Sequence, residues 1–299
     1  MKKVFIIVLN WNGKADTIEC VESLKNIDYP DYKIVIVDNG STDDSVNTLP
    51  KKYFQDNIAF IATKKNLGFS GGNNIGINYA LKNGADYILL LNNDTTVEPD
   101  FLSELVKAGE ADEKTGILGP KIMFYSEKEL IWSAGGKISK NFSCGELVGY
   151  KEKDQGQFDE KKEVDYISGT CLLIKKEVVE KIGPMSEDYF LYYEDTDWNL
   201  RARRAGFKRV FVPQSKIYHK VSRVSVEFSY PYIYYLSRNG LMLASRYGSK
   251  IITYPTSFWI FSKQIIKIII GYKREWARPV AKGVMDFWKG KKGKLEGFY

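Results

Sequence analysis

Cysteine and histidine are scarce in this sequence. Its 299 residues include three cysteines, Cys20, Cys144 and Cys171, and one histidine, His219. The cysteines are odd in number and far apart, which argues against a disulfide framework and against a cysteine-based metal site. This usage is typical of a protein that works in a reducing cytoplasm.

Long hydrophobic runs are also lacking. The apolar run at the N-terminus covers only Val4 to Leu9 and no small-residue cleavage site follows it, so it predicts a first strand instead of a signal peptide. Residues 251–272 are apolar but contain Lys263 and Lys267. Their longest uncharged stretch falls short of the roughly 20 residues that a membrane span needs. We therefore expect no membrane-spanning helix.

Positive charge is concentrated at one end of the chain. The net charge is +7, and from Lys250 onward there are 11 Lys or Arg against 3 Asp or Glu, so the tail alone carries +8. A basic tail on a nearly neutral body favours a polyanionic partner. No nucleic-acid module accompanies the charge, so we expect one or two amphipathic helices at a membrane surface. The alternative is a set of ordinary helices packed on the body with a solvated basic face.

The first hundred residues alternate between short apolar runs and longer mixed stretches. The runs at 4–9, 34–37, 58–62 and 87–91 predict strands that are buried on both faces of a parallel sheet. The stretches at 14–25, 43–49 and 72–83 predict helices, with Ser41 and Asp44 as a cap and its partner. The sequence thus predicts an α/β fold, with a mainly parallel sheet and helices on both faces.

The second half is less regular. Pro99 and the following "DFLSELVKAG" predict a helix, whereas residues 110–165 support little beyond short strands. A strand and a short helix follow in "VDYISGTCLLIKKEVVEKIG", and "YEDTDWNLRARRAGF" has the acidic start and basic end of a helix. The stretch "KRVFVP" predicts a strand that ends at Pro213.

Polar residues follow each predicted strand of the first half. They are Asn10 and Asn12, then Asp38, then Asn66 and Gly68, and finally Asn92, Asn93 and Asp94. Any one of them could simply form a turn. Parallel α/β sheets, however, bind ligands at the carboxyl ends of their strands, and the fold would gather all four groups at one edge. We therefore expect a ligand site there.

The ordered set of motifs resembles the inverting family 2 glycosyltransferases, most closely the rhamnosyltransferase-like branch. The motifs are "VFIIVLNWNG", "IVDNGSTDDS", "NLGFSGGNNIG", "YILLLNNDTTV", "ISGTCLLIKKEVVEKIG" and "YEDTDWNLRARRAGF", and the likeness covers roughly residues 3–245. The resemblance implies a GT-A fold with a C-terminal helical extension. It also implies a nucleotide-diphosphate sugar donor and a divalent metal, Mn²⁺ or Mg²⁺.

The resemblance also implies roles for single residues. Asp38 matches a base-contacting aspartate, and Asn92 to Asp94 match a D-x-D segment whose last carboxylate binds the metal, although Asn92 departs from the acidic pattern. His219 matches a second metal ligand. The expected donor-binding residues are Asn10, Asn12, Asp38, Asn66, Gly68, Asn74, Asn92 and Asn93.

Inversion requires a base that takes the proton of the acceptor hydroxyl. Asp195 in "YEDTDW" matches this base, and Glu194 and Asp197 are the competing carboxylates, with acceptor orientation as their expected role. We expect Ser168, Gly169 and Thr170 to line the pocket for the donor sugar or the acceptor.

The expected organisation is a catalytic domain over 1–225 and a helical, basic and aromatic region over 226–299. The first has a nucleotide half at about 1–97 and an acceptor half at about 98–225. The expected activity is transfer of one sugar, from dTDP-rhamnose or a UDP-sugar, to a glycan or lipid-linked acceptor at the cytoplasmic face of the membrane. Single additions are favoured because the sequence lacks the Q-x-x-R-W segment and the multiple spans of processive synthases.

Two other functions remain open from the sequence. A sugar nucleotidyltransferase would need a Gly- and Arg-rich loop after the first strand, where the chain has "NWNGKADT". A non-catalytic glycan- or membrane-binding protein would fit a degenerate transferase scaffold.

The aromatic segment "YPYIYYLSRNGLML" could contact either a second subunit or the tail.

Overall fold

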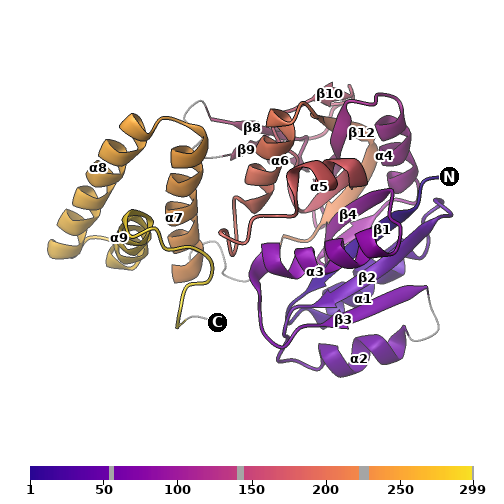
Figure 1. Cartoon of the computed structure of the whole chain (residues 1–299), viewed down its shortest axis with the longest axis horizontal. Helices are drawn as coiled ribbons and strands as arrows, with labels where there is room; N and C mark the ends of the chain where they lie inside the picture. The colour runs from indigo at the N-terminus through magenta and orange to yellow at the C-terminus, as the bar shows by residue number, and fades with distance from the viewer. Residues whose placement is uncertain (54–56, 140–144, 222–228, 298–299) are drawn as a thin grey trace.

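The computed structural model describes residues 1–53, 57–139, 145–221 and 229–297 (Figure 1). The strands are β1 (Val4–Asn10), β2 (Tyr32–Asp38), β3 (Ile58–Ala62), β4 (Tyr87–Asn92), β5 (Thr95–Val97), β6 (Thr115–Phe124), β7 (Ile131–Ser133), β8 (Gly136–Ile138), β9 (Gly145–Leu147), β10 (Lys162–Glu163), β11 (Cys171–Lys175) and β12 (Lys208–His219). The helices are α1 (Lys14–Leu24), α2 (Ser45–Lys52), α3 (Gly68–Lys82), α4 (Phe101–Glu110), α5 (Lys176–Ile182), α6 (Glu194–Arg204), α7 (Tyr230–Tyr247), α8 (Lys250–Ile269) and α9 (Arg274–Trp288).

One large sheet organises the main body. Its strands run in the order β10-β12-β6-β11-β4-β1-β2-β3, with β5 paired to β12 and β7 paired to β6. The strands β1 to β4 are parallel, β11 runs antiparallel between β4 and β6, and β6 and β12 are parallel to each other. Because the register of β1 sets Asn10 beside Asp38 and Leu9 beside Asn92, three strands end together at one edge.

Helices cover both faces of the sheet, as the sequence predicted. On β1, Val4, Ile6 and Val8 pack with apolar residues of α1 and α4, whereas Phe5 and Ile7 pack on the other face with residues of α3, α5 and α6. The alternation of the strand divides its side chains between two buried layers. This explains why the run from Val4 to Val8 is apolar at every position.

Three sequence predictions about the elements were wrong in part. Helix α3 begins at Gly68 instead of residue 72, and α2 begins at Ser45 with Asp44 as its N-cap residue, so Ser41 is not the cap. Strand β12 continues past Pro213 to His219, with a register shift between Val212 and Lys216 that accommodates the proline.

The segment 110–165 contains more sheet than the sequence indicated. Strand β6 is ten residues long and almost wholly buried, although "TGILGPKIMF" includes two glycines, a proline and a lysine. Lys121 is tolerated there because its Nζ lies 2.6 Å from Asp159 Oδ1 and 2.9 Å from Asp154 Oδ2. A buried charge needs such partners, and these come from residues more than thirty positions away.

The C-terminal helices α7, α8 and α9 form a separate group beside the sheet body (Figure 1). Tyr234 on α7 donates a 2.9 Å hydrogen bond to Asp286 Oδ2 on α9, so the aromatic segment contacts the tail, one of its two predicted partners. After α9 the chain returns to the body, where Gly293 N donates to Asp188 O at 2.8 Å. The expected domain boundary at 225/226 lies outside the described residues.

Within the described ranges, the structure contains no helix that is both long and apolar enough to cross a membrane.

Candidate active site

A cavity of about 580 Å³ lies at the carboxyl edge of the first sheet strands. Six of the predicted residues contribute to its wall: Asn12, Asn66, Gly68, Asn92, Asn93 and Asp94. Further lining residues include Trp11, Asp16, Asn39, Phe69, Phe190 and Leu191. The sheet therefore does gather the polar strand ends around one cavity, as its topology required.

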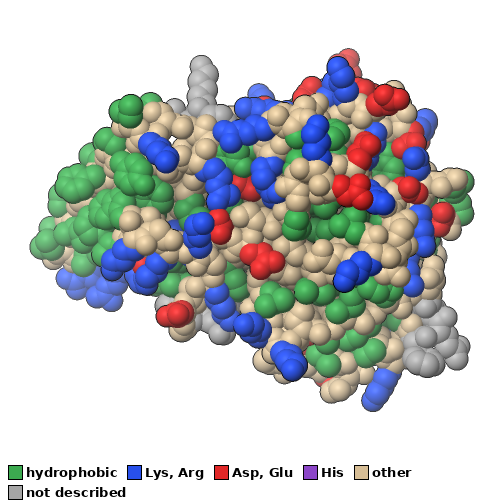
Figure 2. Space-filling view, viewed as in Figure 1, with side chains coloured by type: hydrophobic (Ala, Val, Ile, Leu, Met, Phe, Trp, Pro, Cys, Tyr) green, Lys and Arg blue, Asp and Glu red, His purple; other side chains and the backbone are tan. Residues whose placement is uncertain are grey.

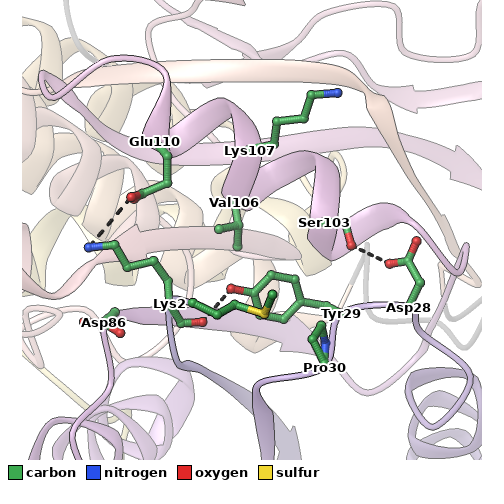
Figure 3. A pocket seen from close by; sticks show the side chains of 10 residues that line it. Lys2, Asp28, Tyr29, Pro30, Asp86, Ser103, Val106, Lys107 and Glu110 are labelled. Atoms are coloured by element: carbon green, nitrogen blue, oxygen red, sulfur yellow. Dashed lines mark hydrogen bonds and ion pairs between the residues drawn. The ribbon is translucent and has the colours of Figure 1, made fainter.

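A larger cavity, of about 910 Å³, lies at the opposite edge of the sheet (Figure 3). Its polar side chains are engaged with one another: Lys2 pairs with Glu110 at 3.7 Å, and Ser103 donates to Asp28. The carboxyl edge is the better candidate because that edge is where parallel sheets bind ligands and where the predicted carboxylate and imidazole meet.

Asn10 and Asp38 are joined to each other and are not among the residues that line the cavity. Both side chains are fully buried, and Asn10 Nδ2 donates a 2.7 Å hydrogen bond to Asp38 Oδ2. The other oxygen of Asp38 accepts from Ser41 N at 3.0 Å, and Thr17 Oγ1 donates to Asn10 Oδ1 at 2.8 Å. In this arrangement Asp38 orders the strand ends, and its predicted contact with a nucleotide base stays a prediction.

Asn12 organises the loop after β2. Its side-chain oxygen accepts from Thr42 N at 2.7 Å and from Asp43 N at 3.2 Å, while its own N–H donates to Ser41 Oγ at 2.9 Å. Its φ of 54° lies in the left-handed region, which asparagine adopts more readily than most residues. Asn12 therefore both lines the cavity and joins two of its loops.

Asn39 joins β2 to the start of α3. Its amide donates to Asn66 Oδ1 at 3.2 Å and to Gly68 O at 3.0 Å, and its oxygen accepts from Leu67 N at 3.0 Å. Gly68 N in turn donates to Asn66 Oδ1 at 2.8 Å. The N–H of Gly68, the first residue of α3, is thus already bonded to a side chain, and Gly68 lets its backbone lie at the cavity wall.

Gly68 is required where α3 meets the segment before α6. Its φ is +77°, and a Cβ at this position would lie 2.2 Å from the carbonyl oxygen of Phe190. Phe69 N donates to the same oxygen at 2.8 Å, and Ser70 Oγ donates to Tyr189 O at 2.6 Å. These bonds hold the Phe190 segment against the cavity wall.

Asp94 and His219 are brought together by the pairing of β5 with β12. His219 lies opposite Thr95 in that antiparallel pair, and the residue before Thr95 is Asp94. His219 Nε2 lies 3.2 Å from Asp94 Oδ1, and the chain is fixed further by Lys220 N, which donates to Asp94 O at 2.9 Å. A residue pair 125 positions apart in sequence is therefore in contact.

The Asp94 and His219 pair fits a divalent cation in its chemistry and spacing. Adjacent ligands of an octahedral ion with bonds of about 2.1 Å lie about 3.0 Å apart, close to the observed separation. Imidazole beside carboxylate suits Mn²⁺ better than Ca²⁺, and His219 is buried, with its Nδ1 lacking a hydrogen-bond partner. Among the described residues, there is no cluster of three or more His, Cys, Asp or Glu side chains that could hold a metal.

Asp195 stands at the start of α6, next to the segment 168–170. Its Oδ2 accepts from Gly169 N at 2.9 Å, and its Oδ1 accepts from Thr196 N at 2.6 Å. Gly169 lies between Asp195 and the cavity residue Phe69, since a Cβ there would contact both side chains. Thr170 O accepts from Asn92 N at 2.9 Å, which joins this segment to the strand end of the cavity.

Burial raises the pKa of Asp195 above its ordinary value of 3.8, although the donors from Gly169 and Thr196 partly oppose the shift. Burial also raises the pKa of Glu194 well above 4.5, and the neighbouring charge of Asp195 adds to that shift. Glu194 Oε2 is buried and has no hydrogen-bond partner. Of the two carboxyl groups, Glu194 therefore has the stronger tendency to keep its proton, because the negative charge of Asp195 adds to the effect of burial on its pKa.

Asp197 and Asn74 have structural partners. Asp197 is fully buried, and Arg201 Nε donates to its Oδ2 at 2.9 Å. Two residues of α7, Arg246 at 2.9 Å and Tyr247 at 2.8 Å, donate to its Oδ1. Both ends of the Asn74 amide bind Met185, at 3.0 Å each. Neither residue lines the cavity, so the predicted acceptor and donor contacts of these two residues stay predictions.

Sequence reasoning missed residues that act by holding others. Asn39 directly follows Asp38, and its place after a predicted strand was the signal that could have found it. Asn239 on α7 gave no such signal: its Nδ2 donates to Leu191 O at 2.8 Å and to Tyr192 O at 3.0 Å, across 47 or more positions of sequence.

Comparison with known proteins identifies the family of this chain. The sequence profile of glycosyl transferase family 2 matches residues 5–183. The low-salt glycan biosynthesis hexosyltransferase Agl10 of Haloferax volcanii is 26% identical over 300 residues, covering 97% of this chain and 92% of that protein. The dTDP-rhamnosyl transferase RfbF of Shigella flexneri is 27% identical over 228 residues, covering 75% of this chain and 71% of that protein.

Among solved structures, GalNAc-T7 with UDP, GalNAc and Mn²⁺ superposes with a TM-score of 0.70. The identity is 15%, and the match covers 97% of this chain and 56% of that one. At this identity the likeness concerns the fold, which is GT-A, as the motifs implied.

Proposed function

Because this chain belongs to glycosyl transferase family 2, we propose that it transfers a single sugar, with inversion, from a nucleotide-diphosphate sugar to a hydroxyl of a glycan or lipid-linked glycan. The observation that carries the proposal is the cavity at the carboxyl edge of the sheet, which strand-end amides and Asp94 line, with His219 3.2 Å from Asp94. The names of the two relatives favour dTDP-rhamnose or another hexose donor, and UDP-sugars are the alternative donors.

The donor half of the reaction is assigned to the wall of this cavity. Asn12, Asn66, Asn92 and Asn93 present amides to the ribose and diphosphate, and the exposed ring of Trp11 offers a flat apolar surface to a base or sugar. The Nδ2 of Asn93 donates to Thr17 Oγ1 at 3.0 Å, which leaves its Oδ1 to accept a hydrogen bond from a ribose hydroxyl.

Asp94 and His219 would hold Mn²⁺ or Mg²⁺. A bound cation would supply positive charge beside the diphosphate as it leaves. Asn92 adds no charge to this site, so the protein offers one carboxylate and one imidazole. We propose that metal affinity is weak until the donor arrives with further oxygen ligands.

The acceptor half is assigned to Asp195. It accepts the proton of the acceptor hydroxyl while that oxygen forms a bond to the anomeric carbon. The bond from that carbon to the diphosphate breaks, and the electron pair leaves with the nucleoside diphosphate. The raised pKa of Asp195 makes it a stronger base than an exposed aspartate. Ser168, Gly169 and Thr170, which surround Asp195 and Asn92, are assigned to the sugar or acceptor pocket, with Glu194 beside them.

The test is a transfer assay with the variant Asp195→Asn. Nucleotide sugars, including dTDP-rhamnose and UDP-sugars, are first screened for thermal stabilisation and Mn²⁺-dependent hydrolysis. The variant is expected to lose transfer by about a thousandfold or more while its donor affinity stays within about threefold, since the base acts on the acceptor. Wild-type turnover in this variant would overturn the assignment. A non-catalytic protein would show no turnover with any donor, and a nucleotidyltransferase would instead consume a sugar phosphate and a nucleoside triphosphate.

We also propose a division at about residue 225 and a location for the protein. Residues 1–97 would bind the nucleotide, 98–225 the acceptor, and the basic aromatic region 226–299 the cytoplasmic face of the cell membrane. The charge of the tail supports this location. In the alternative, the same helices form the contact between the subunits of a homo-oligomer.

A further inference from the structure

Helix α8 is packed with its polar residues inward and its apolar residues outward. Its buried residues are Thr253, Ser257 and Gln264. Large apolar side chains lie on the outside, with exposed fractions of 86% for Ile251, 64% for Phe258 and 63% for Trp259. A helix at a water surface has the reverse arrangement, so water is not the environment to which this face is fitted.

The exposed apolar residues form one continuous face. A helix turns by about 100° per residue, so Ile251, Trp259, Ile266 and Ile269 lie within one sector of its circumference. Figure 2 shows this face as the large hydrophobic patch at the left, over α8. The outer face consists of Ile251, Ile252, Phe258, Trp259, Ile266, Ile269 and Ile270, all of them exposed.

The inner side of α8 is firmly attached to α9. Trp288 Nε1 donates a 2.8 Å hydrogen bond to Ser257 Oγ, and the ring of Phe261 lies 5.0 Å from that of Trp288. Tyr254 and Phe287 are also in ring contact, at 5.3 Å. These contacts fix the rotation of α8, so the outer face is held outward by the fold.

Basic residues border the outer face. Lys263 and Lys267 follow its edge along the helix, and the Lys263 ammonium lies 5.0 Å from the Trp259 ring. Lys250, Lys273 and Arg274 are exposed near the two ends of α8. Long basic side chains beside apolar and aromatic ones suit the boundary between lipid phosphates and acyl chains.

We propose that the outer face of α8 docks flat on an anionic phospholipid bilayer. Its apolar side chains enter the boundary between headgroups and acyl chains, and Lys263 and Lys267 contact lipid phosphates. At 20 residues the helix is about 30 Å long, and Lys263 and Lys267 in its C-terminal half favour lying in the plane of the surface. A second copy of the chain is the weaker occupant, because two such tails would bring charges of +8 together. The inference deepens the proposed membrane location by naming the surface that makes the contact.

The experiment is flotation of the full chain with vesicles of pure phosphatidylcholine and of phosphatidylcholine with 30% phosphatidylglycerol. The wild type is expected to float with the anionic vesicles. The double variant Phe258→Ser/Trp259→Ser is expected to lose about tenfold or more of its partitioning, because two large apolar side chains no longer enter the lipid. The variant Lys263→Gln/Lys267→Gln is expected to bind anionic vesicles more weakly and to lose part of the salt dependence.

Tyr150→Ser is the matched control, since Tyr150 is an exposed aromatic on the sheet body, and its partitioning should equal that of the wild type. Equal thermal melting of all variants would show that the fold is intact. A wild type that stays unbound, or a Phe258→Ser/Trp259→Ser variant that floats as well as the wild type, would overturn the proposal. So would a concentration-dependent dimer in sedimentation that this double variant abolishes.

The test is independent of the transferase assignment. Mn²⁺-dependent hydrolysis of the nucleotide sugar, measured without vesicles, should be the same in the α8 variants and the wild type. Failure of flotation with intact hydrolysis would reject the docking surface alone, whereas hydrolysis that is absent or insensitive to Asp195→Asn would reject the proposed function alone.

Discussion

Asn239 on α7 donates a 3.0 Å hydrogen bond to the carbonyl oxygen of Tyr192, three residues before Asp195. Tyr192 and Tyr193 have φ values of 67° and 74°, a region that large side chains rarely adopt. The C-terminal helices thus hold in place the strained segment that leads to the proposed base.

The variant Asn239→Asp tests this coupling. It preserves the acceptor that binds Arg238 Nε at 2.9 Å but removes the donor to the two carbonyls. We expect kcat to fall about tenfold to a hundredfold, corresponding to about 1–3 kcal/mol for unsatisfied buried groups, with donor affinity unchanged. Ser237→Ala on the same helix is the control, because its hydroxyl binds only within α7. A fall in stability with kcat per folded molecule unchanged would contradict a positioning role.

Metal removal tests the Asp94–His219 pair. We expect EDTA to abolish transfer and Mn²⁺ to restore it, with Asp94→Asn and His219→Ala each raising the Mn²⁺ concentration for half-maximal rate by about tenfold or more. Glu19→Gln is the control, since that carboxylate binds Lys220 and Tyr125 instead. Full activity after exhaustive chelation would mean that the 3.2 Å contact is a hydrogen bond between the two side chains.

Gly68→Ala is expected to destabilise the protein more than Gly84→Ala. Both glycines have positive φ values, 77° and 81°, but a Cβ at Gly84 meets nothing within 4 Å, whereas one at Gly68 meets the Phe190 carbonyl at 2.2 Å. Backbone strain costs about 1–2 kcal/mol in each variant, and the clash adds about 1–3 kcal/mol for Gly68 alone. Urea unfolding of the pair measures the difference. Equal losses would show that the Phe190 segment moves aside freely.

The raised pKa of Glu194 predicts a pH-dependent gain in the variant Glu194→Gln. Between the ordinary pKa of 4.5 and the higher folded value, the unfolded chain has lost the proton that the folded chain keeps. The wild type therefore loses stability from this group as pH rises through that window, by up to about 1.4 kcal/mol per pH unit. The variant lacks this loss, so its advantage should grow above pH 4.5 and vanish below it. An advantage that is constant from pH 4 to pH 8 would refute the shift.

Asp197→Asn is expected to act on stability instead of acceptor binding. It removes the fully buried charge that pairs with Arg201 and Arg246, which should cost about 3 kcal/mol. Asp188→Asn is the control: Asp188 also pairs with Arg246, at 2.7 Å, but is partly exposed and should cost less than about 1 kcal/mol. A large rise in the acceptor KM with unchanged unfolding free energy would instead return Asp197 to the acceptor pocket.

Local pattern was enough to predict the framework of the site. The unalternated runs at β1, β2 and β4 specified parallel strands, and parallel strands bring Asn10, Asp38 and Asn92 to one edge. Strand β6 escaped prediction because Gly119, Pro120 and Lys121 interrupt its apolar run. What makes those residues acceptable is their neighbours in space, including the carboxylates that neutralise Lys121.

The sequence by itself determined the α/β order, the polar strand ends and the residues available for chemistry, since these depend on periodicity and on neighbours in the chain. Only the tertiary structure decided which of those residues work together. The pairing of β5 with β12 brings His219 into contact with Asp94. Asp197 is buried in an ion pair, and because α8 packs on α9 through its polar side, its apolar side faces outward. Contacts between distant segments depend on how surfaces fit, and a linear pattern carries no record of that fit.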